Sequence, residues 1–468
     1  MRRKTYADHE REVVRLSNEL ISRTRKKEAL PRALGPVSTS SHQTRNAPYK
    51  EHEPLLNLSR FNAILEINTH DRIALVEPKV TMEELTRATL LHGLMPEVVC
   101  EFKEITVGGA IMGAGLESSS HRFGQFNDSC LWYEVVLADG ERLKIGPEAH
   151  PELFYALPGS YGTLCWVTLA AIRLIPAAPY VHCRYQEHTS RTEALKALTT
   201  PGEALFRDGV AFGPGSYLTV EGTPTEHADV PLLLLSDKRS PWYVQHLAYR
   251  TEEEAYLPIR DYLFRYDRAA FWMGQFLLSP GPLFAFLTRS KRGWAKPRGG
   301  APRYPGPLFR LLFNNLLSSK RLYDALHRLP PSLFEETFLV QDCILPASRS
   351  DAFLAATEEA FQIAPLWLCP IKRAPQRQPL SPHSLPTDEP VLLNVGLYGV
   401  PNIGGNAVDA TRHLEALTLA HGGRKGLYSH SYYTPETFWT IYDREGYEAL
   451  RRDYRAEGLN HLEEKVLR

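Results

Sequence analysis

Cysteine is scarce in this sequence and is not arranged for chemistry. The 468 residues include six cysteines, which are Cys100, Cys130, Cys165, Cys183, Cys343 and Cys369. No two of them have CxxC or metal-ligand spacing, which excludes a zinc-ribbon type of site and a disulfide framework. We therefore expect no metal site, and buried thiols in a reducing compartment.

A charge surplus and a long apolar run are also missing. Lys plus Arg and Asp plus Glu both number 54, and this balance disfavours a nucleic-acid partner, which usually requires a basic surplus. No window reaches the ~18 apolar residues that span a bilayer. The best window, which starts at Phe271, is interrupted by Pro280 and Pro282. The N-terminus lacks the apolar core of a signal peptide.

The composition is that of a globular protein, and the length predicts two or three domains. Hydrophobic residues make up 43% and charged residues 23% of the chain. Local signals predict a helix over about 8–28, two strands around the turn 68–71, and a helix capped by Thr81 and Glu84. Asp139-Gly140 predicts a hairpin turn. Later strands are predicted at "VLLNVGLYG" and "GLYSHSYY", and the last thirty residues read as helical.

Three loops of small residues are the most informative feature. The longest is "EITVGGAIMGAGLESSSHRFG", which we call the glycine-rich segment (residues 104–124). The others are "STSSHQTR", residues 38–45, and "GSYGTL", residues 159–164. Backbone N–H groups in such loops form anion-binding concavities, and missing side chains permit close approach of a ring or a pyrophosphate. The alternative interpretation is a cluster of structural turns.

The same segment imitates a dinucleotide fingerprint but does not complete it. In "GAGLES" the third glycine is replaced by Ser118, and no strand–turn–helix context surrounds the motif. A Rossmann site is therefore disfavoured.

Longer motifs extend the interpretation to a family. The segments "VEPKVTMEELTRATLLHGLMPEV", "ITVGGAIMGAGLESSSHRFG", "YEVVLADGE" and "ELFYALPGSYGTLCWVTLAAIRLIP" occur in that order. This order resembles the FAD-binding domain of the vanillyl-alcohol-oxidase (PCMH) type, and within it the Δ24-sterol reductases of animals and plants. "FLVQDCILP", "PLWLCPIKRAP", "NVGLYGVP" and "GLYSHSYYTPETFWTIYDREGYEALRRDY" continue the resemblance through most of the chain.

The resemblance implies an α+β fold of two domains. Residues 1–178 would form a PCMH-type FAD-binding domain of two α+β subdomains. Residues 179–468 would form an α+β substrate domain whose last helices return to the first. The FAD would be noncovalent. The expected contacts are Ser38, Thr39, Ser40, Ser41, Thr106, Val107, Gly108, Gly109, Ala110, Ile111, Met112, Gly113, Ala114, Gly115, Leu116, Glu117, Ser118, Gly162 and Thr163.

The implied activity is reduction of the C24–C25 side-chain double bond of a sterol, with NADPH as electron donor. An isolated alkene accepts hydride only when an acid polarises it, and Tyr432 is the expected proton donor because it matches a family tyrosine. Asp342 reads equally well as a catalytic or a structural carboxylate. The alternatives are an alcohol or lactone oxidase of the same superfamily, or a non-catalytic relative that binds sterol or a partner.

Several departures from the family pattern bear on location and activity. Ser38 to Thr44 differ from the animal loop, Cys165 stands where glycine is frequent, and residues 283–305 read as an insertion that is basic and aromatic. Such a segment suits an anionic lipid surface, although a solvated loop explains it equally well. The expectation is peripheral attachment to the endoplasmic reticulum membrane, with cytoplasm as the alternative. The oligomeric state stays open.

Overall fold

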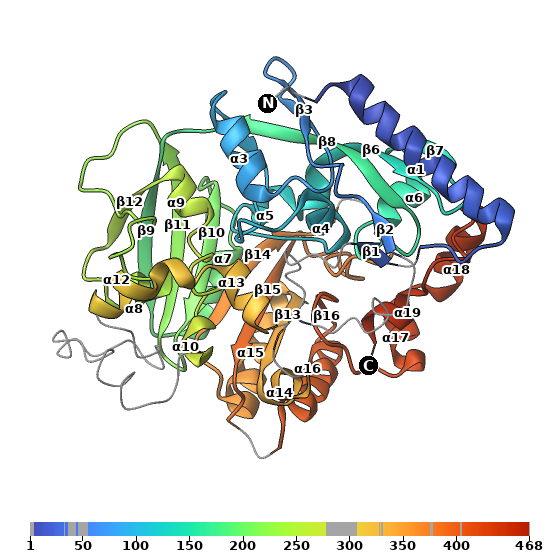
Figure 1. Cartoon of the computed structure of the whole chain (residues 1–468). Coiled ribbons are helices and arrows are strands. Elements are labelled where there is room, and N and C mark those ends of the chain that lie inside the picture. The colour runs from blue at the N-terminus through green and yellow to red at the C-terminus, as the bar shows by residue number, and fades with distance from the viewer. Residues whose placement is uncertain are drawn as a thin grey trace.

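Two antiparallel sheets organise the chain (Figure 1). The computed structural model describes residues 4–31, 33–35, 44, 55–277, 307–326, 328, 331–374, 378–402 and 405–467. Among these residues, no helix combines the length and apolarity needed to cross a bilayer. The mixture of helices and antiparallel sheets confirms the α+β class, and the antiparallel pairing agrees with the rejection of a Rossmann unit.

The smaller sheet lies in the N-terminal part of the chain. Its strands, in spatial order, are β3 (Ile64–Asn68), β4 (Ile73–Val76), β8 (Trp166–Pro176), β6 (Cys130–Val136) and β7 (Arg142–Ile145), with β5 (Leu94–Pro96) paired to β8. The predicted hairpin turn is confirmed, since Gly140 adopts a φ of 92° between β6 and β7. A separate parallel pair joins β1 (Ala33–Gly35) to β2 (Leu55–Asn57).

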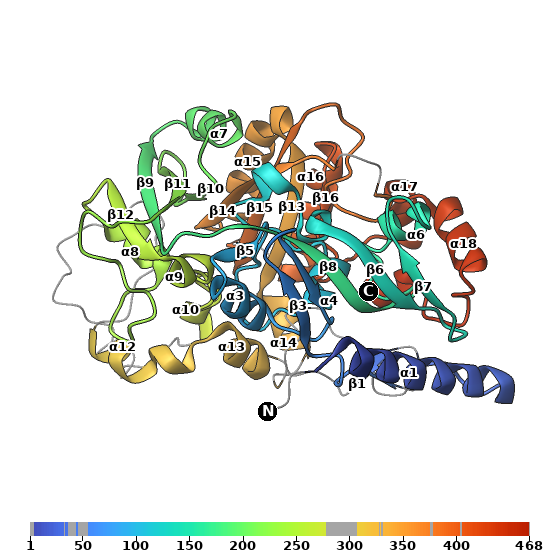
Figure 2. The ribbon, with the colours of Figure 1, turned by 90° about the horizontal axis from the view of Figure 1, so that it is seen from above.

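One helix of this part begins at the cap that the sequence predicts. Its helical elements are α1 (Tyr6–Lys26), α3 (Met82–Leu90), α4 (Val107–Met112), α5 (Ser120–Phe123), the 3-10 turn η1 (Phe126–Ser129) and α6 (Pro151–Ala156). The capping box at α3 is present, with Thr81 and Glu84 each accepting from the other's backbone N–H. Figure 2 shows α1 lying along one side of the molecule.

The larger sheet belongs to the C-terminal part. Its spatial order is β12 (Glu254–Pro258), β9 (Tyr180–His188), β11 (Tyr217–Thr225), β10 (Phe206–Ala211), β14 (Leu366–Lys372), β15 (Val391–Gly399), β13 (Leu339–Pro346) and β16 (Arg424–Lys425). Side chains alternate between its faces. Leu345 and Leu393 pack on the outer face, whereas Ile344, Trp367 and Tyr398 point to the inner face, toward the N-terminal part.

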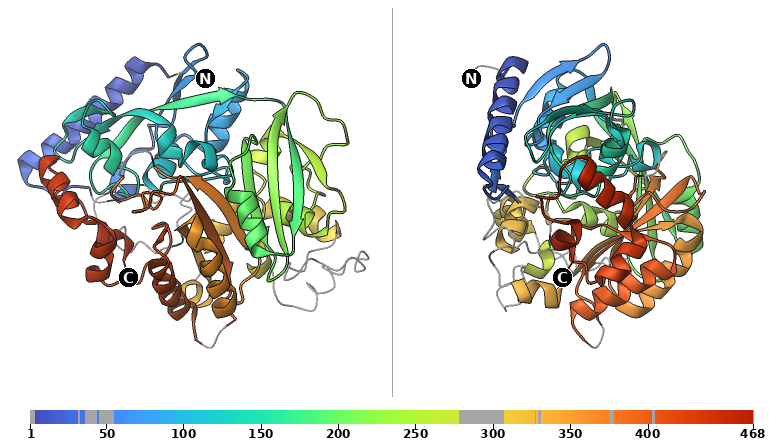
Figure 3. Two further views of the ribbon diagram at one scale, coloured as in Figure 1. Left: turned by 180° about the vertical axis from the view of Figure 1, so that it is seen from behind. Right: turned by 90° about the vertical axis from the view of Figure 1, so that its right-hand side faces the viewer.

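Helices cover both the outer face and the ends of this sheet. They are α7 (Arg191–Thr199), α8 (Tyr243–Tyr249), α9 (Ile259–Leu263), α10 (Gly274–Leu277), α12 (Pro307–Phe313), η2 (Asn314–Leu316), α13 (Ser319–Leu326), α14 (Pro331–Thr337), α15 (Ala347–Phe361), α16 (Ala407–Ala420), α17 (Pro435–Ile441), α18 (Arg444–Asp453) and α19 (Leu462–Val466). Helices α7, α15 and α16 pack on the outer face. Figure 3 shows α17 to α19 beside the N-terminal part.

One predicted strand is wrong. Of "GLYSHSYY", which begins at Gly426, no residue lies in a strand, and the preceding strand β16 ends at Lys425. Side chains hold the segment in place of a ladder: Gln341 donates to the carbonyl of His430 at 3.1 Å, and Ser429 donates to Gln341 at 2.6 Å.

Candidate functional site

Most glycines of the glycine-rich segment lie so close to other protein atoms that a side chain would not fit. A Cβ on Gly108 would lie 2.8 Å from the Cβ of Pro78, and one on Gly115 would lie 2.5 Å from the Sγ of Cys100. In the third loop, a Cβ on Gly159 would lie 2.1 Å from the carbonyl oxygen of Leu380. These glycines therefore allow close packing against neighbouring protein atoms, as the structural alternative proposes.

A smaller set of groups faces open space. Gly109 is exposed, and Gly162, at a φ of 73°, has no atom within 4 Å of an added Cβ. The N–H of Leu116 has no hydrogen-bond acceptor in the part of the chain that the structure describes. The half-buried Lys79, next to Pro78, likewise has no carboxylate partner there, and burial lowers the pKa of its ammonium.

The start of the segment is built as a short helix beside these groups. Thr106 caps α4 by accepting from the N–H of Gly109 at 3.2 Å. Ser160 donates to the sulfur of Met112 at 3.3 Å, which joins α4 to the loop of Gly162. The C-terminal helices hold that loop: Arg451 donates to the carbonyl of Thr163 at 2.9 Å, and Lys465 donates to that of Tyr161 at 3.1 Å.

The end of the segment is tied to the larger sheet rather than left open. The N–H of Glu117 donates to the hydroxyl of Ser120 at 2.9 Å, and the N–H of Ser118 donates to the carboxylate of Glu117. The carbonyl of Ser118 accepts from the N–H of Arg207 on β10 at 2.8 Å. The sequence predicts cofactor contacts at Glu117 and Ser118, and in the structure the N–H groups of both residues and the hydroxyl of Ser118 donate to other protein groups.

Arg265 completes this connection as a buried clamp. One of its nitrogens, Nη2, lies 3.0 Å from Oε1 of Glu117 and 2.8 Å from Oδ2 of Asp208 on β10. Tyr266 and Trp367 also donate to that oxygen of Asp208, at 2.8 and 3.1 Å. Burial lowers the pKa of the Arg265 guanidinium, but Glu117 and Asp208 outweigh that effect and raise the pKa well above its usual range.

A second carboxylate stands on the inner face of the larger sheet. Asp342 lies on β13, two residues before Ile344, and therefore shares its face. Ile344 and its neighbours contact Leu116 of the glycine-rich segment, so Asp342 faces that segment. Its oxygens accept from Asn394 at 2.6 Å, Tyr398 at 2.8 Å and Tyr428 at 2.7 Å.

Burial and hydrogen bonds act in opposite directions on this group. Burial raises the pKa of Asp342, while the three donors lower it, and the net direction is upward. Burial likewise raises the pKa values of Tyr398 and Tyr428 far above their usual range, so both hydroxyls stay protonated.

Tyr432 does not belong to this group. Its N–H donates to both carboxylate oxygens of Glu415 at 3.0 and 3.2 Å, and the guanidinium of Arg412 lies 5.4 Å from its ring centre. Both partners are on α16, which packs on the outer face. Ser38, Thr39, Ser40 and Ser41 lie outside the described residues. The sequence does not predict a role for Lys79 or Arg265, because no pattern in the residues around them indicates that they are buried.

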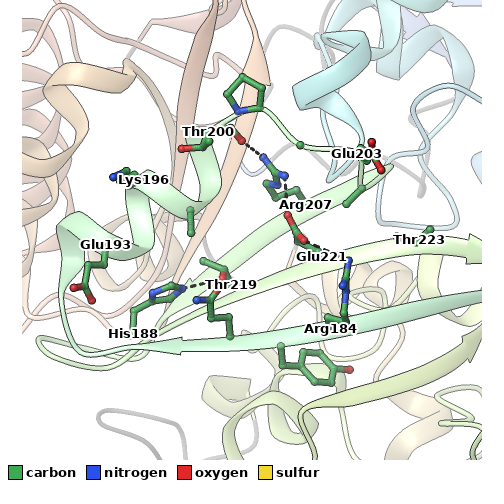
Figure 4. Close-up of a pocket in the computed structure, with 16 residues that line it drawn as sticks. Arg184, His188, Glu193, Lys196, Thr200, Glu203, Arg207, Thr219, Glu221 and Thr223 are labelled. Carbon is green, nitrogen blue, oxygen red and sulfur yellow. Dashed lines mark hydrogen bonds and ion pairs between the residues drawn. The ribbon is translucent and has the colours of Figure 1, made fainter.

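A surface groove of about 1050 Å³ lies on the outer face, between α7 and the strands β9 and β11 (Figure 4). Its lining includes the ion pair of Arg207 and Glu221, 2.7 Å apart, and His188, which hydrogen-bonds Thr219 at 3.0 Å. The end of the glycine-rich segment reaches one edge of the groove, because Arg122 donates to the carbonyl of Glu203 at 3.4 Å.

Comparisons with known proteins agree with this geometry. A family model described as "FAD binding domain" matches residues 21–146. The Delta(24)-sterol reductase of Homo sapiens is 32% identical over 400 residues, covering 83% of this chain and 72% of the human protein. That of Arabidopsis thaliana is 29% identical over 452 residues, covering 88% and 76%. Cytokinin dehydrogenase 10 of Oryza sativa is 35% identical over 94 residues only, which cover 20% of this chain and 17% of the rice protein. The extent of the match to the human enzyme shows that the chain belongs to the Delta(24)-sterol reductase family.

Proposed function

We propose that the protein is an FAD-dependent oxidoreductase that reduces the C24–C25 double bond of a sterol with NADPH. The observation that carries the proposal is the arrangement of Asp342 and its hydroxyl partners on a sheet face that meets the glycine-rich segment at Leu116. Members of the family are named for the reduction of such a bond.

The residues present fit a flavin nucleotide. The exposed Gly109 and the open position at Gly162 leave room for close approach. Among the described residues, the N–H of Leu116 has no acceptor and the half-buried Lys79 has no counter-charge. An anionic pyrophosphate would neutralise that cation. We assign contact with the cofactor to residues 106–116, Gly162 and Thr163, and an anchoring role to Glu117 and Ser118. Bound FAD would supply a hydride acceptor and donor.

The protein's own residues would orient the alkene and stabilise the charge that develops on it during the reaction. Aromatic side chains of the larger domain enclose the inner face, with the ring of Phe271 5.2 Å from Trp367 and 5.0 Å from Tyr398. Such a wall suits an apolar sterol side chain and excludes water. The charge of Asp342 would stabilise positive charge that develops on the alkene during proton addition.

The decisive test uses the purified protein, FAD, NADPH and a Δ24-sterol. We expect a yellow protein whose flavin is bleached by NADPH without oxygen, and a sterol product heavier by two hydrogens in mass spectrometry. Bleaching by alcohols but not by NADPH would instead identify the oxidase alternative. A colourless protein that refuses added FAD would refute both and leave a binding role.

We further propose contact with a lipid surface through the exposed leucines around η2. Leu312 and Leu316 are 55% and 51% exposed, which is unusual for large apolar side chains. The sequence between residues 289 and 303 adds lysines and arginines and no acidic residue, a composition that favours anionic lipid.

A further inference from the structure

Glu101 lies at the seam between the glycine-rich segment and the larger domain. It belongs to the loop that joins β5 to α4. Its neighbour Cys100 packs its sulfur against Gly115. Its other neighbour, Phe102, has its ring 5.9 Å from that of Phe271 and 6.0 Å from that of Tyr323 on α13. Glu101 is thus held between a residue that touches Gly115, a proposed cofactor contact, and one that touches the proposed substrate wall.

Within the described residues, the carboxyl group of Glu101 has no structural role as an acceptor for another residue. No side chain of the described residues hydrogen-bonds or pairs with it. Glu117 and Asp342, by contrast, are engaged by Arg265 and by three donors respectively. The residue is surrounded by protein yet only half-buried, so its carboxyl is not sealed in the fully packed core.

The surroundings of Glu101 raise the pKa of its carboxyl group. Burial is the main cause that raises its pKa, to about 8, and the negative charges of Glu117 and Asp342 act in the same direction. Its own backbone N–H and the more distant Arg265 lower the pKa without reversing the direction. At neutral pH Glu101 is therefore a carboxylic acid with an O–H to donate.

The hydroxyls on the same side are poorer acids. Burial raises the pKa values of Tyr323 and Tyr428 far above neutrality. The negative charge of Glu101 acts in the same direction on both tyrosines, which indicates that they lie near it. The tyrosines therefore shape the space and hydrogen-bond within it, whereas a neutral carboxyl is the stronger proton source for an unactivated alkene.

We propose that Glu101 is the general acid that protonates the substrate double bond. The inference rests on the proposed function. The Glu101 O–H bond breaks and a C–H bond forms at one alkene carbon with the π electron pair. The other carbon accepts the hydride that the reduced flavin supplies, and NADPH is the ultimate reductant. The Glu101 carboxylate then regains a proton from water, so that one alkene, one NADPH and one proton give the saturated side chain and NADP⁺.

The test compares Glu101→Gln with the matched variant Glu104→Gln. Glu104 lies in the same loop, is half-buried, and has a pKa that burial also raises. Flavin bleaching by NADPH and reoxidation of the bleached flavin by a Δ24-sterol are followed separately by anaerobic stopped flow. For Glu101→Gln we expect reoxidation to slow at least about 100-fold, within the range known for general acids, while bleaching changes less than about threefold. Glu104→Gln should change neither step by more than about twofold.

Two further readouts separate proton donation from a structural role. The infrared band of a protonated carboxyl should be present in the apoprotein at neutral pH and lost in Glu101→Gln. The reoxidation rate of the unmutated protein should fall above about pH 8, as the acid ionises, and the residual rate of the variant should not. Reoxidation of Glu101→Gln at the unmutated rate, or an unchanged infrared band, overturns the proposal. Failure of the unmutated protein to reduce the sterol refutes the proposed function itself and removes the basis for this role.

Discussion

Replacing Glu101 with glutamine should change how stability depends on pH, independently of any activity. The folded-state pKa is about 8, against about 4.3 in an unfolded chain. The carboxyl is therefore neutral when folded and charged when unfolded between those values, and unfolding releases a proton. Its contribution to stability is fully present below about pH 4 and is lost progressively as the pH rises to about 8.

The size of the effect follows from the width of this window. Each pH unit within it removes about 1.4 kcal/mol, so the change from about pH 5 to about pH 8 is about 4 kcal/mol. Glutamine has a similar shape and no proton to lose. Relative to the unmutated protein, Glu101→Gln should therefore gain about 4 kcal/mol over this interval, equivalent to about 4 °C or more in apparent Tm for a chain of this length.

The assay is thermal unfolding of the apoprotein at both pH values. Glu66→Gln, at an exposed position on β3, serves as the control for the charge change itself. Parallel pH profiles for Glu101→Gln and the unmutated protein would show that Glu101 titrates like an ordinary carboxyl, and the electrostatic reasoning for the site would be refuted.

Three other changes test separate parts of the structure. Arg265→Met leaves two buried carboxylates without a cation and should cost about 3–5 kcal/mol, so an unchanged apparent Tm would refute the clamp. Gly162→Ala and Gly93→Ala both place a side chain at positive φ in open space, each costing about 1 kcal/mol. Only Gly162→Ala should also weaken FAD binding, by at least about tenfold in fluorescence titration; equal affinities would remove this loop from the cofactor site. Leu312→Glu should reduce cosedimentation with vesicles of anionic lipid, whereas Leu91→Glu, also at an exposed leucine, should not; equal binding would exclude this surface.

Local signals in the sequence predicted local structure well. The capping box of α3 and the Gly140 turn depend on residues only a few positions apart, and both are present. The strand predicted from Gly426 is wrong, and side chains far away in sequence bind backbone groups of this segment: Gln341 donates to the carbonyl of His430, and Glu415 accepts from the N–H of Tyr432.

The chemistry of the site depended on distant contacts and was harder to predict. The sequence alone could not show that Gly108 and Gly115 make room for Pro78 and Cys100 rather than for a ligand. Glu101 reads as an ordinary loop glutamate until the larger domain encloses it. The resemblance points to Tyr432 by its position in a motif, whereas the tyrosine that donates to Asp342 on the inner face is Tyr428.

The support that Arg451 and Lys465 give to the loop at residues 161–163 has a consequence for biosynthesis. A ribosome makes the N-terminal part first, and domains generally fold as they emerge. Here, however, Arg451 and Lys465 follow their partners Thr163 and Tyr161 in the sequence by 288 and 304 residues. The nascent chain would then lack both contacts until Lys465 leaves the exit tunnel, so the loop would reach its final packing long after its own residues are made.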